Sequence, residues 1–236
     1  MTEGPVRRFY AAVAVAPTEG GFAITLDGRP VRTPAKARLA VPGRALADAI
    51  AAEWAAQRER IDPASMPLTR LASTAVDLVT PRRDAVVAEI TKYAATDLVC
   101  YRADHPPELV ARQHRAWQPL VEWVAQRYAA PLEVTTGILP QPQSGASLAA
   151  LRQAVDAYDA MALAALNFAT AACGSMVLAL ALAEGRLDAA EAFAAAQLDE
   201  SFEIEQWGED AEQMARRAAL GDDIAAAAQF LALLRA

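Results

Sequence analysis

The chain has 236 residues, of which 54% are hydrophobic, and it carries a formal charge of −7 at pH 7. This composition permits a sizeable buried core and excludes disorder over most of the length. Residues 184–236 hold 12 Asp and Glu against 4 Arg, and such an acidic end repels phosphate backbones. We therefore do not expect nucleic acid as a ligand, and we expect the acidic end to suit a basic protein surface.

The first residues, Met1-Thr2-Glu3-Gly4-Pro5, lack the apolar segment of a signal peptide and the Arg-rich helix of a transit peptide. We therefore expect a cytoplasmic location. Cys100 and Cys173 form no CxxC pair, and the two histidines, His105 and His114, are nine residues apart. We expect two buried thiols in a reducing compartment, and no metal site or cofactor.

Residues 1–64 are expected to form a small β-rich domain with one helix. Residues 22–26 alternate apolar and small side chains, and Asp27-Gly28 after them is a strong hairpin signal. Prolines at positions 30, 34 and 42 confine the neighbouring strands to edges or strand ends. The apolar spacing then changes to that of a helix over residues 43–59, and Trp54 on this helix is expected to pack inside.

Residues 65–236 are expected to form a larger, all-helical C-terminal domain, which gives an α+β fold with a small antiparallel sheet at the N-terminal end. Helical periodicity marks residues 66–79, 82–96, 107–129, 146–158, 160–184, 188–207 and 209–233. Residues 97–101 and 132–135 are short β-prone pieces that form either strands or extended connectors.

Residues 161–183 are almost wholly apolar and long enough to cross a bilayer. Arg152, Asp156 and Asp159 precede them, and no second span or basic flank follows. We therefore expect a buried central helix and no stable membrane insertion. A membrane-associated factor that uses this segment as an anchor is the alternative.

The segment around residues 198–210 is acidic and contains large apolar side chains. On one continuous helix, Phe193, Glu200, Ile204 and Trp207 share a face, and a carboxylate within an apolar stripe is costly to bury without a partner. Either Glu200 has a partner inside the fold, or the stripe contacts another molecule. Trp207-Gly208 is expected to end the helix, with a left-handed glycine and the indole packed against the preceding turn.

Asp199, Glu200 and Glu203 supply carboxylates that an acid/base mechanism could use. However, no nucleophile, metal ligand or oxyanion donor lies near them in sequence, and the common catalytic motifs are missing. We therefore do not expect an enzyme. An enzyme that uses Glu200 and Asp199 as acid and base is kept as the alternative function.

Four blocks of sequence resemble the family of F1-ATP synthase assembly chaperones that act on the α subunit, called ATP synthase assembly factor 2 in mitochondria. The blocks are residues 26–34 (LDGRPVRTP), residues 53–57, 61–63 and 66–69 (EWAAQ, IDP and MPLT), residues 97–102 (DLVCYR) with Gln113, Trp117 and Pro119, and residues 203–208 (EIEQWG). They keep their order over about residues 8–220.

The resemblance implies a non-enzymatic, two-domain chaperone that binds unassembled F1 α subunit and releases it into the hexamer of α and β subunits. It implies an acidic functional position in the last block's helix, here Asp199 or Glu200. We hypothesise that Asp199, Glu200 and Glu203 face the client beside Phe193, Ile204 and Trp207. We expect the free chaperone to be a monomer.

Overall fold

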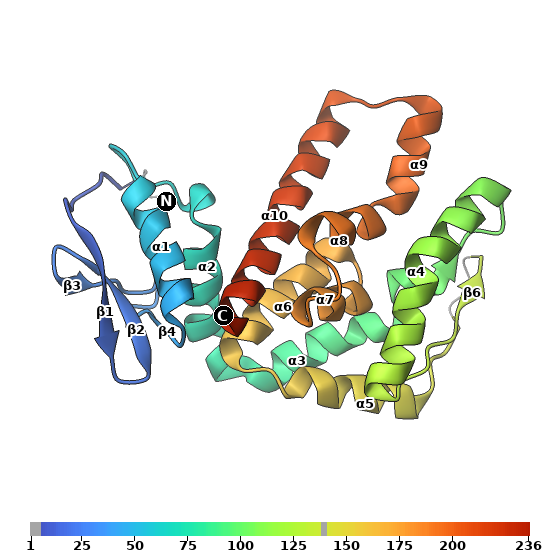
Figure 1. Cartoon of the computed structure of the whole chain (residues 1–236), viewed down its shortest axis with the longest axis horizontal. Helices are drawn as coiled ribbons and strands as arrows, with labels where there is room; N and C mark the ends of the chain where they lie inside the picture. The colour runs from blue at the N-terminus through green and yellow to red at the C-terminus, as the bar shows by residue number, and fades with distance from the viewer. Residues whose placement is uncertain (1–5, 138–140) are drawn as a thin grey trace. The chain divides into compact units, whose positions relative to one another are not determined.

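The computed structural model describes residues 6–137 and 141–236, and it confirms the expected α+β class (Figure 1). The chain forms two compact units. The first unit comprises residues up to Arg83 together with residues 160–165 and 229–236, and the second comprises residues 84–159 and 166–228. The domain boundary expected after residue 64 stays a prediction, and the structure groups residues 65–83 with the sheet.

The sheet of the first unit is antiparallel and is built around one central strand. Strand β2 (Gly21–Leu26) pairs with β1 (Val13–Thr18) along its whole length, and with the short β3 (Arg29–Pro30) and β4 (Ala40–Val41). Asp27 and Gly28 both have positive φ, 49° and 79°, which is the geometry of a type I′ turn. The hairpin predicted from Asp27-Gly28 is therefore confirmed.

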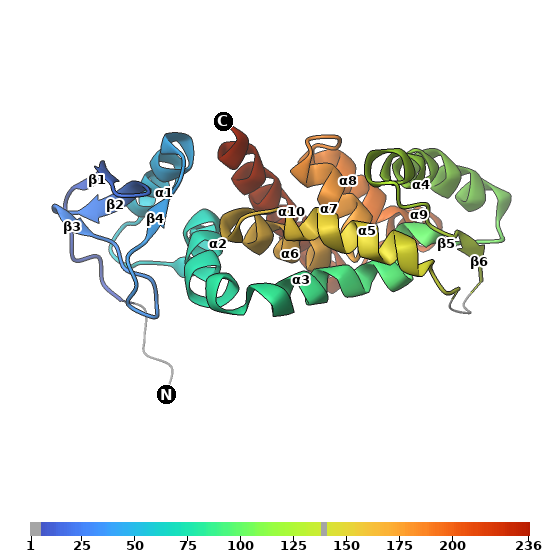
Figure 2. The same ribbon diagram turned by 90° about the horizontal axis from the view of Figure 1, so that it is seen from below.

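Helix α1 (Arg44–Ala56) confirms the predicted first helix and packs on the sheet (Figure 2). It buries Leu46 and Ile50. Its Glu53 carboxylate accepts backbone N–H bonds from Leu68 and Thr69 at 2.7 and 2.8 Å. These donors belong to the first turn of the next helix, where N–H groups have no partner within the helix, so Glu53 joins the two helices. Burial nevertheless raises the pKa of Glu53.

The rest of the first unit follows that helix. Helix α2 (Pro67–Thr74) continues into a π-helical turn (Ala75–Val79) and a 3₁₀ turn (Thr80–Arg82), and a 3₁₀ turn (Pro63–Ser65) precedes it. Trp54 is only half-buried and lines two surface hollows, so the expectation that it is a core residue is wrong. The buried face of α1 is formed by smaller aliphatic side chains instead.

Helices make up most of the second unit, and two of them also include residues 160–165 and 229–235 of the first unit. Their bounds are α3 (Arg83–Lys92), α4 (Pro107–Tyr128), α5 (Gly145–Asp156), α6 (Ala160–Cys173), α7 (Met176–Ala183), α8 (Ala189–Ala196), α9 (Leu198–Trp207) and α10 (Ala211–Arg235), with 3₁₀ turns at Tyr93–Thr96 and Leu98–Cys100. Only the last residue of each β-prone piece lies in a strand, and these strands form a parallel pair, β5 (Tyr101–Arg102) with β6 (Thr135–Thr136).

The single helix expected over residues 160–184 is wrong, because the chain breaks at Gly174, which has a φ of 63°. The next residue, Ser175, donates its hydroxyl to the buried carboxylate of Asp97 at 2.5 Å. Asp97 also accepts the N–H of Val177 at 3.0 Å. It therefore caps α7 from a distant part of the sequence. Complete burial raises the pKa of Asp97 to about 6 in spite of these hydrogen bonds.

All eight residues of α7 are buried, so this half of the apolar segment is the core helix that the sequence predicted. Among the described residues, no helix is both long enough and apolar enough to cross a membrane.

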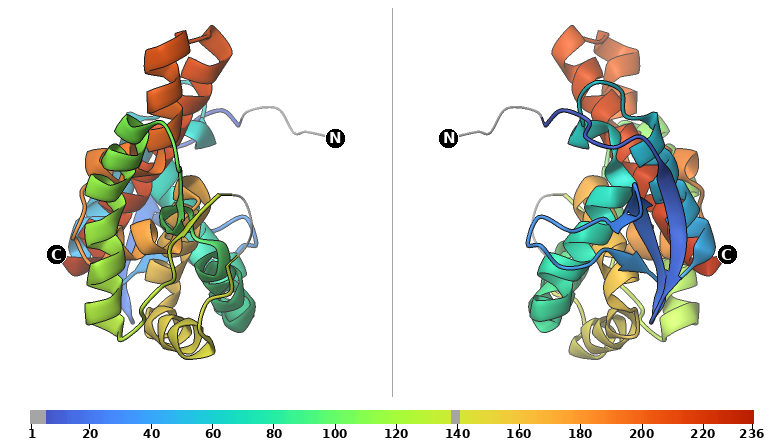
Figure 3. Two further views of the ribbon diagram at one scale, coloured as in Figure 1. Left: turned by 90° about the vertical axis from the view of Figure 1, so that its right-hand side faces the viewer. Right: turned by 90° about the vertical axis from the view of Figure 1, so that its left-hand side faces the viewer.

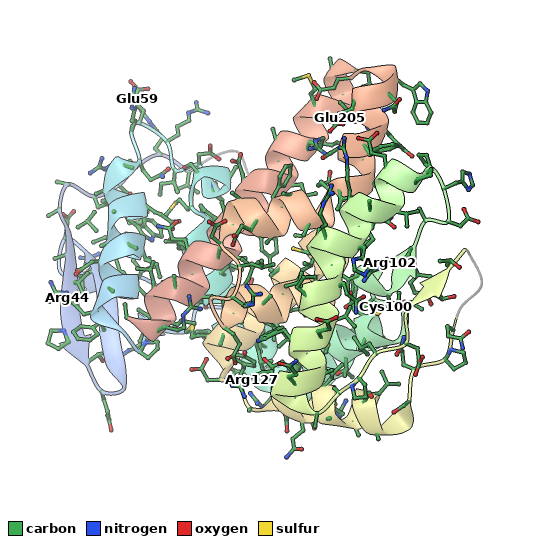
Figure 4. All side chains as sticks on the ribbon, turned by 45° about the vertical axis from the view of Figure 1, so that its right-hand side comes forward. Arg44, Glu59, Cys100, Arg102, Arg127 and Glu205 are labelled. Atoms are coloured by element: carbon green, nitrogen blue, oxygen red, sulfur yellow. The ribbon has the colours of Figure 1, made fainter. Side chains whose placement is uncertain are left out.

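Cys100 and Cys173 are both free and buried, as expected. Burial raises the pKa of each thiol to about 12, which leaves both uncharged and weakly reactive at neutral pH. Figure 4 labels Cys100 inside the second unit, next to Arg102. Within residues 6–137 and 141–236, no three His, Cys, Asp or Glu side chains form a group that could hold a metal ion.

Candidate functional site

The continuous helix expected over residues 188–207 is wrong, because the chain forms two helices, α8 and α9, separated at Gln197. The buried indole of Trp117, on α4, donates its Nε1–H to the carbonyl oxygen of Ala195 at 2.9 Å. That carbonyl lies in the last turn of α8, where it has no partner within the helix. The predicted stripe therefore divides, because Phe193 lies on α8 while Glu200, Ile204 and Trp207 lie on α9.

Phe193 packs within the fold. Its half-buried ring lies under the guanidinium of Arg217 on α10, 5.1 Å from the ring centroid. Arg217 also donates to the Ser201 hydroxyl at 3.0 Å and to the Gln197 side-chain oxygen at 3.3 Å. Phe193 and Arg217 thus connect α8, α9 and α10.

Asp199 also faces inward. Its Oδ1 accepts a hydrogen bond of 2.8 Å from Nε2 of Gln113, a fully buried side chain on α4. The other end of the same amide, Oε1 of Gln113, accepts the backbone N–H of Ala103 at 2.8 Å. Both functions of the Gln113 amide are satisfied, and one of them holds α9 against α4 through Asp199.

Arg112 provides a second connection between α4 and α9. Its guanidinium binds Glu205 and Glu108 at 2.8 and 2.7 Å and lies 5.2 Å from the ring centroid of Phe202. Phe202 is the buried residue of α9. The hydrogen bond from Arg112 lowers the pKa of Glu205, which Figure 4 labels on α9. The sequence analysis missed both Arg112 and Phe202, because their pairing joins positions far apart in the chain.

The outer side of α9 remains open to solvent. Glu200 and Glu203 are exposed, and within the described part of the chain neither carboxylate makes a hydrogen bond or ion pair. Ile204 is half-buried beside them. Gly208 ends the helix with a φ of 86°, as expected, but Trp207 is 80% exposed. The expectation that its indole packs against the preceding turn is therefore wrong.

Helices α9 and α10 form a hairpin, which Figures 1 and 3 show from different sides. Two exposed apolar side chains lie near its turn, Trp207 and Met214, and the second is 52% exposed. We call the exposed side chains of this region the hairpin surface. It consists of Glu200, Glu203, Trp207, Glu209, Glu212 and Met214.

The acid/base pair of the alternative function is not formed in this structure. Glu200 lines a hollow of about 310 Å³ together with Arg216 and Arg217, whereas Asp199 is not part of its lining. Asp199 is directed to Gln113 instead. The two carboxylates therefore do not face a common pocket, which an acid and a base acting on one substrate would require.

The two-unit α+β fold of this chain occurs in a class of chaperones. The sequence model of the ATP12 chaperone protein family matches residues 7–125. Atp12 from Paracoccus denitrificans, whose crystal structure is known, is 44% identical in sequence to this chain. The two structures match over 98% of this chain and 99% of that one, with a TM-score of 0.93. The chain belongs to the ATP12 chaperone protein family, whose members act in the assembly of ATP synthase.

Two further relatives agree with this assignment. A candidate chaperone from Agrobacterium tumefaciens is 44% identical, with a TM-score of 0.92 over 97% of this chain and 86% of its own. The mitochondrial protein atp12 of Schizosaccharomyces pombe is 24% identical over 226 residues, which is 88% of this chain and 76% of that protein. The resemblance seen in the four sequence blocks is therefore confirmed as membership of the family.

Proposed function

We propose that this chain binds the unassembled α subunit of F1-ATPase in the bacterial cytoplasm and releases it into the hexamer of α and β subunits. Membership of the ATP12 chaperone family supports a role in ATP synthase assembly. The two crystal structures from bacterial species support the bacterial setting. The choice of the α subunit follows the resemblance of the four sequence blocks.

The observation that carries this proposal is the exposure of Trp207 among unpaired carboxylates. A large aromatic side chain that is 80% exposed is costly for a protein acting alone, and such residues are enriched at protein interfaces. Glu200 and Glu203 on the same helix can attract a basic client surface and set its orientation. The hairpin surface thus combines an apolar anchor with acidic groups around it.

Within the predicted set, the structure supports different roles for different residues. Glu200, Glu203 and Trp207 are exposed, and we infer that they contact the client, with Ile204 at the edge. Asp199 is bonded to Gln113, and Phe193 lies against Arg217. We infer that these last two predicted residues hold the hairpin in position from inside the second unit.

Co-expression with the α subunit in the absence of the β subunit tests the proposal. We expect the chain to keep the α subunit soluble and to be recovered with it in a pull-down. Trp207→Ala should lower the affinity at least about tenfold, since truncation of an aromatic anchor at an interface costs about 2 kcal/mol or more. Glu200→Gln and Glu203→Gln together should weaken capture, and the loss should be largest at low salt.

Two control variants accompany these substitutions. Asp199→Asn keeps the oxygen that accepts from Gln113, and Glu133→Gln changes an exposed carboxylate outside the hairpin surface. Both should capture the α subunit normally. Normal capture by the Trp207 and glutamate variants would show that the hairpin surface is not the contact. Failure of the unchanged chain to retain soluble α subunit would overturn the proposed function itself.

A further inference from the structure

The first unit contains a second surface with exposed apolar side chains. Two hollows, of about 690 and 580 Å³, are both lined by Trp54 and Arg32. Phe9 borders the smaller hollow and Leu78 the larger, and these side chains are 69% and 52% exposed. We call the two hollows together the Trp54 groove. Exposed apolar residues around a concave site are typical of binding surfaces.

The charged side chains of the groove leave it basic. Arg29, Arg32 and Arg70 are exposed along it, whereas its two carboxylates are used by the fold. Asp27 accepts two backbone N–H bonds, which lower its pKa, and Asp77 accepts a threonine hydroxyl at 2.7 Å and a backbone N–H at 3.0 Å. Both carboxylates keep their negative charge, but the three arginines outnumber them, so the lining of the groove carries a net positive charge.

The whole first unit also carries a net positive charge. Its residues hold 13 Lys and Arg against 8 Asp and Glu, and those of the second unit hold 9 against 21. The groove and the hairpin surface therefore belong to units of opposite charge. A ligand that suits one of them is electrostatically unsuited to the other.

Trp54 itself has an unused hydrogen-bond donor. Its backbone carbonyl accepts the hydroxyl of Tyr10 at 2.8 Å, and the two rings meet edge to face with centroids 5.8 Å apart. Its indole Nε1–H, however, is buried and has no acceptor within residues 6–137 and 141–236. A buried donor without an acceptor is uncommon in folded proteins, and the ring that carries it lines both hollows.

We propose that the Trp54 groove binds an apolar, acidic peptide segment of the client in an extended form. Its apolar side chains occupy the two hollows lined by Trp54, and its carboxylates pair with Arg29, Arg32 and Arg70. The identity of the client rests on the proposed function, whereas the peptide chemistry rests on the groove alone. The chaperone thereby holds one client at two chemically different segments, a basic one at the hairpin surface and an acidic one at the groove.

The direct test uses the full chain and a fluorescein-labelled synthetic peptide in which Leu and Phe alternate with Asp and Glu. A second peptide with Lys in place of the acidic residues is the comparison. We expect the acidic peptide to bind at least about tenfold more tightly in anisotropy titrations, and the difference to shrink as salt is added. In a ¹⁵N spectrum, the indole N–H resonance of Trp54 should shift as the acidic peptide is added.

Substitutions locate the binding. Arg70→Gln and Leu78→Ser change exposed side chains, so both should keep the melting temperature while each weakens acidic-peptide binding at least about fivefold. Arg115→Gln and Val134→Ser are matched changes at exposed positions of the second unit and should bind normally. Equal binding of both peptides, or normal binding by both groove variants, would overturn the proposal.

The proposed function and the proposal for the Trp54 groove can be refuted independently of each other. The peptide titrations contain no α subunit, so the groove chemistry is tested even if the α subunit is not the client. If Trp207→Ala loses the α subunit while Arg70→Gln and Leu78→Ser capture it as well as the unchanged chain does, the groove does not hold this client and the proposed function stands. If the groove variants also lose capture, the groove takes part in holding the client.

Discussion

The buried carboxylate of Asp97 predicts an unusual dependence of stability on pH. Its pKa is raised from 3.8 to about 6 in the folded chain, because complete burial outweighs the hydrogen bonds that it accepts. A group with a raised folded pKa stabilises the fold below its unfolded pKa, and this contribution is lost as the pH rises through about 6. The full effect is about 3 kcal/mol, since each pKa unit corresponds to about 1.4 kcal/mol.

Asp97→Asn removes the titrating group and isolates its effect. The variant is expected to be less stable at every pH, because an amide nitrogen would face the N–H and hydroxyl donors at the start of α7. The stability advantage of the unchanged chain over Asp97→Asn should fall by about 1.4 kcal/mol between about pH 5 and about pH 7.5. Because the other carboxylates are the same in both chains, their contributions cancel in the difference between the two free energies of unfolding.

Urea unfolding followed by circular dichroism, repeated over this pH range, measures that advantage as a difference in free energy of unfolding. A difference that stays constant would show that Asp97 does not titrate between pH 5 and 7.5. A folded pKa lowered by the hydrogen bonds from Ser175 and Val177 would give this constant difference, and a difference that grows with pH would have the sign opposite to that of a raised pKa. Either result would refute the reasoning from burial.

Three further substitutions test contacts that hold each unit together, and urea unfolding measures all of them. Gln113→Leu should lower the free energy of unfolding by about 1–2 kcal/mol, because it leaves the part-buried backbone N–H of Ala103 without its acceptor and Asp199 without its donor; a loss under about 0.5 kcal/mol would contradict this. Glu53→Gln should cost about 1–2 kcal/mol, since the amide can accept only one of the two backbone N–H bonds at the start of α2, and no change would mean that water replaces the carboxylate. Gly21→Ala should cost more than about 2 kcal/mol, because its Cβ would lie 2.2 Å from a backbone carbonyl oxygen of β4. Gly20→Ala, where a Cβ meets open space at a φ of 87°, is the matched control, and an equal loss there would contradict the steric argument.

Sequence patterns correctly predicted the features that depend on the residues of a single turn or a single helix. The Asp27-Gly28 turn and the first helix follow from the local sequence, since type I′ turns and helical periodicity depend on neighbouring residues. The break at Gly174 was missed because the surrounding segment is rich in Ala and Leu, which are strong helix formers. What stabilises that break is the carboxylate of Asp97, 78 residues earlier in the chain.

The candidate site shows the same limit. Sequence analysis found the acidic helix and Trp207, because composition and spacing mark them. It could not separate Asp199 from Glu200, since the difference lies in a hydrogen bond to Gln113 across 86 residues. It also placed Phe193 on the same helix as Trp207. The Trp117 indole donates a hydrogen bond to the Ala195 carbonyl oxygen at the end of α8, and no neighbouring residue in the sequence indicates this contact.

The composition of the first unit also determines when it can finish folding during synthesis. Residues 229–236 belong to that unit, and Phe230 and Leu231 among them are buried. At roughly 5–20 residues per second, ribosomes need roughly 7–30 s to proceed from Arg83 to the start of that segment. Throughout this interval the sheet and its two helices lack their last core residues. The first unit of the newly made chaperone is therefore completed only after all residues of the second unit have been synthesised.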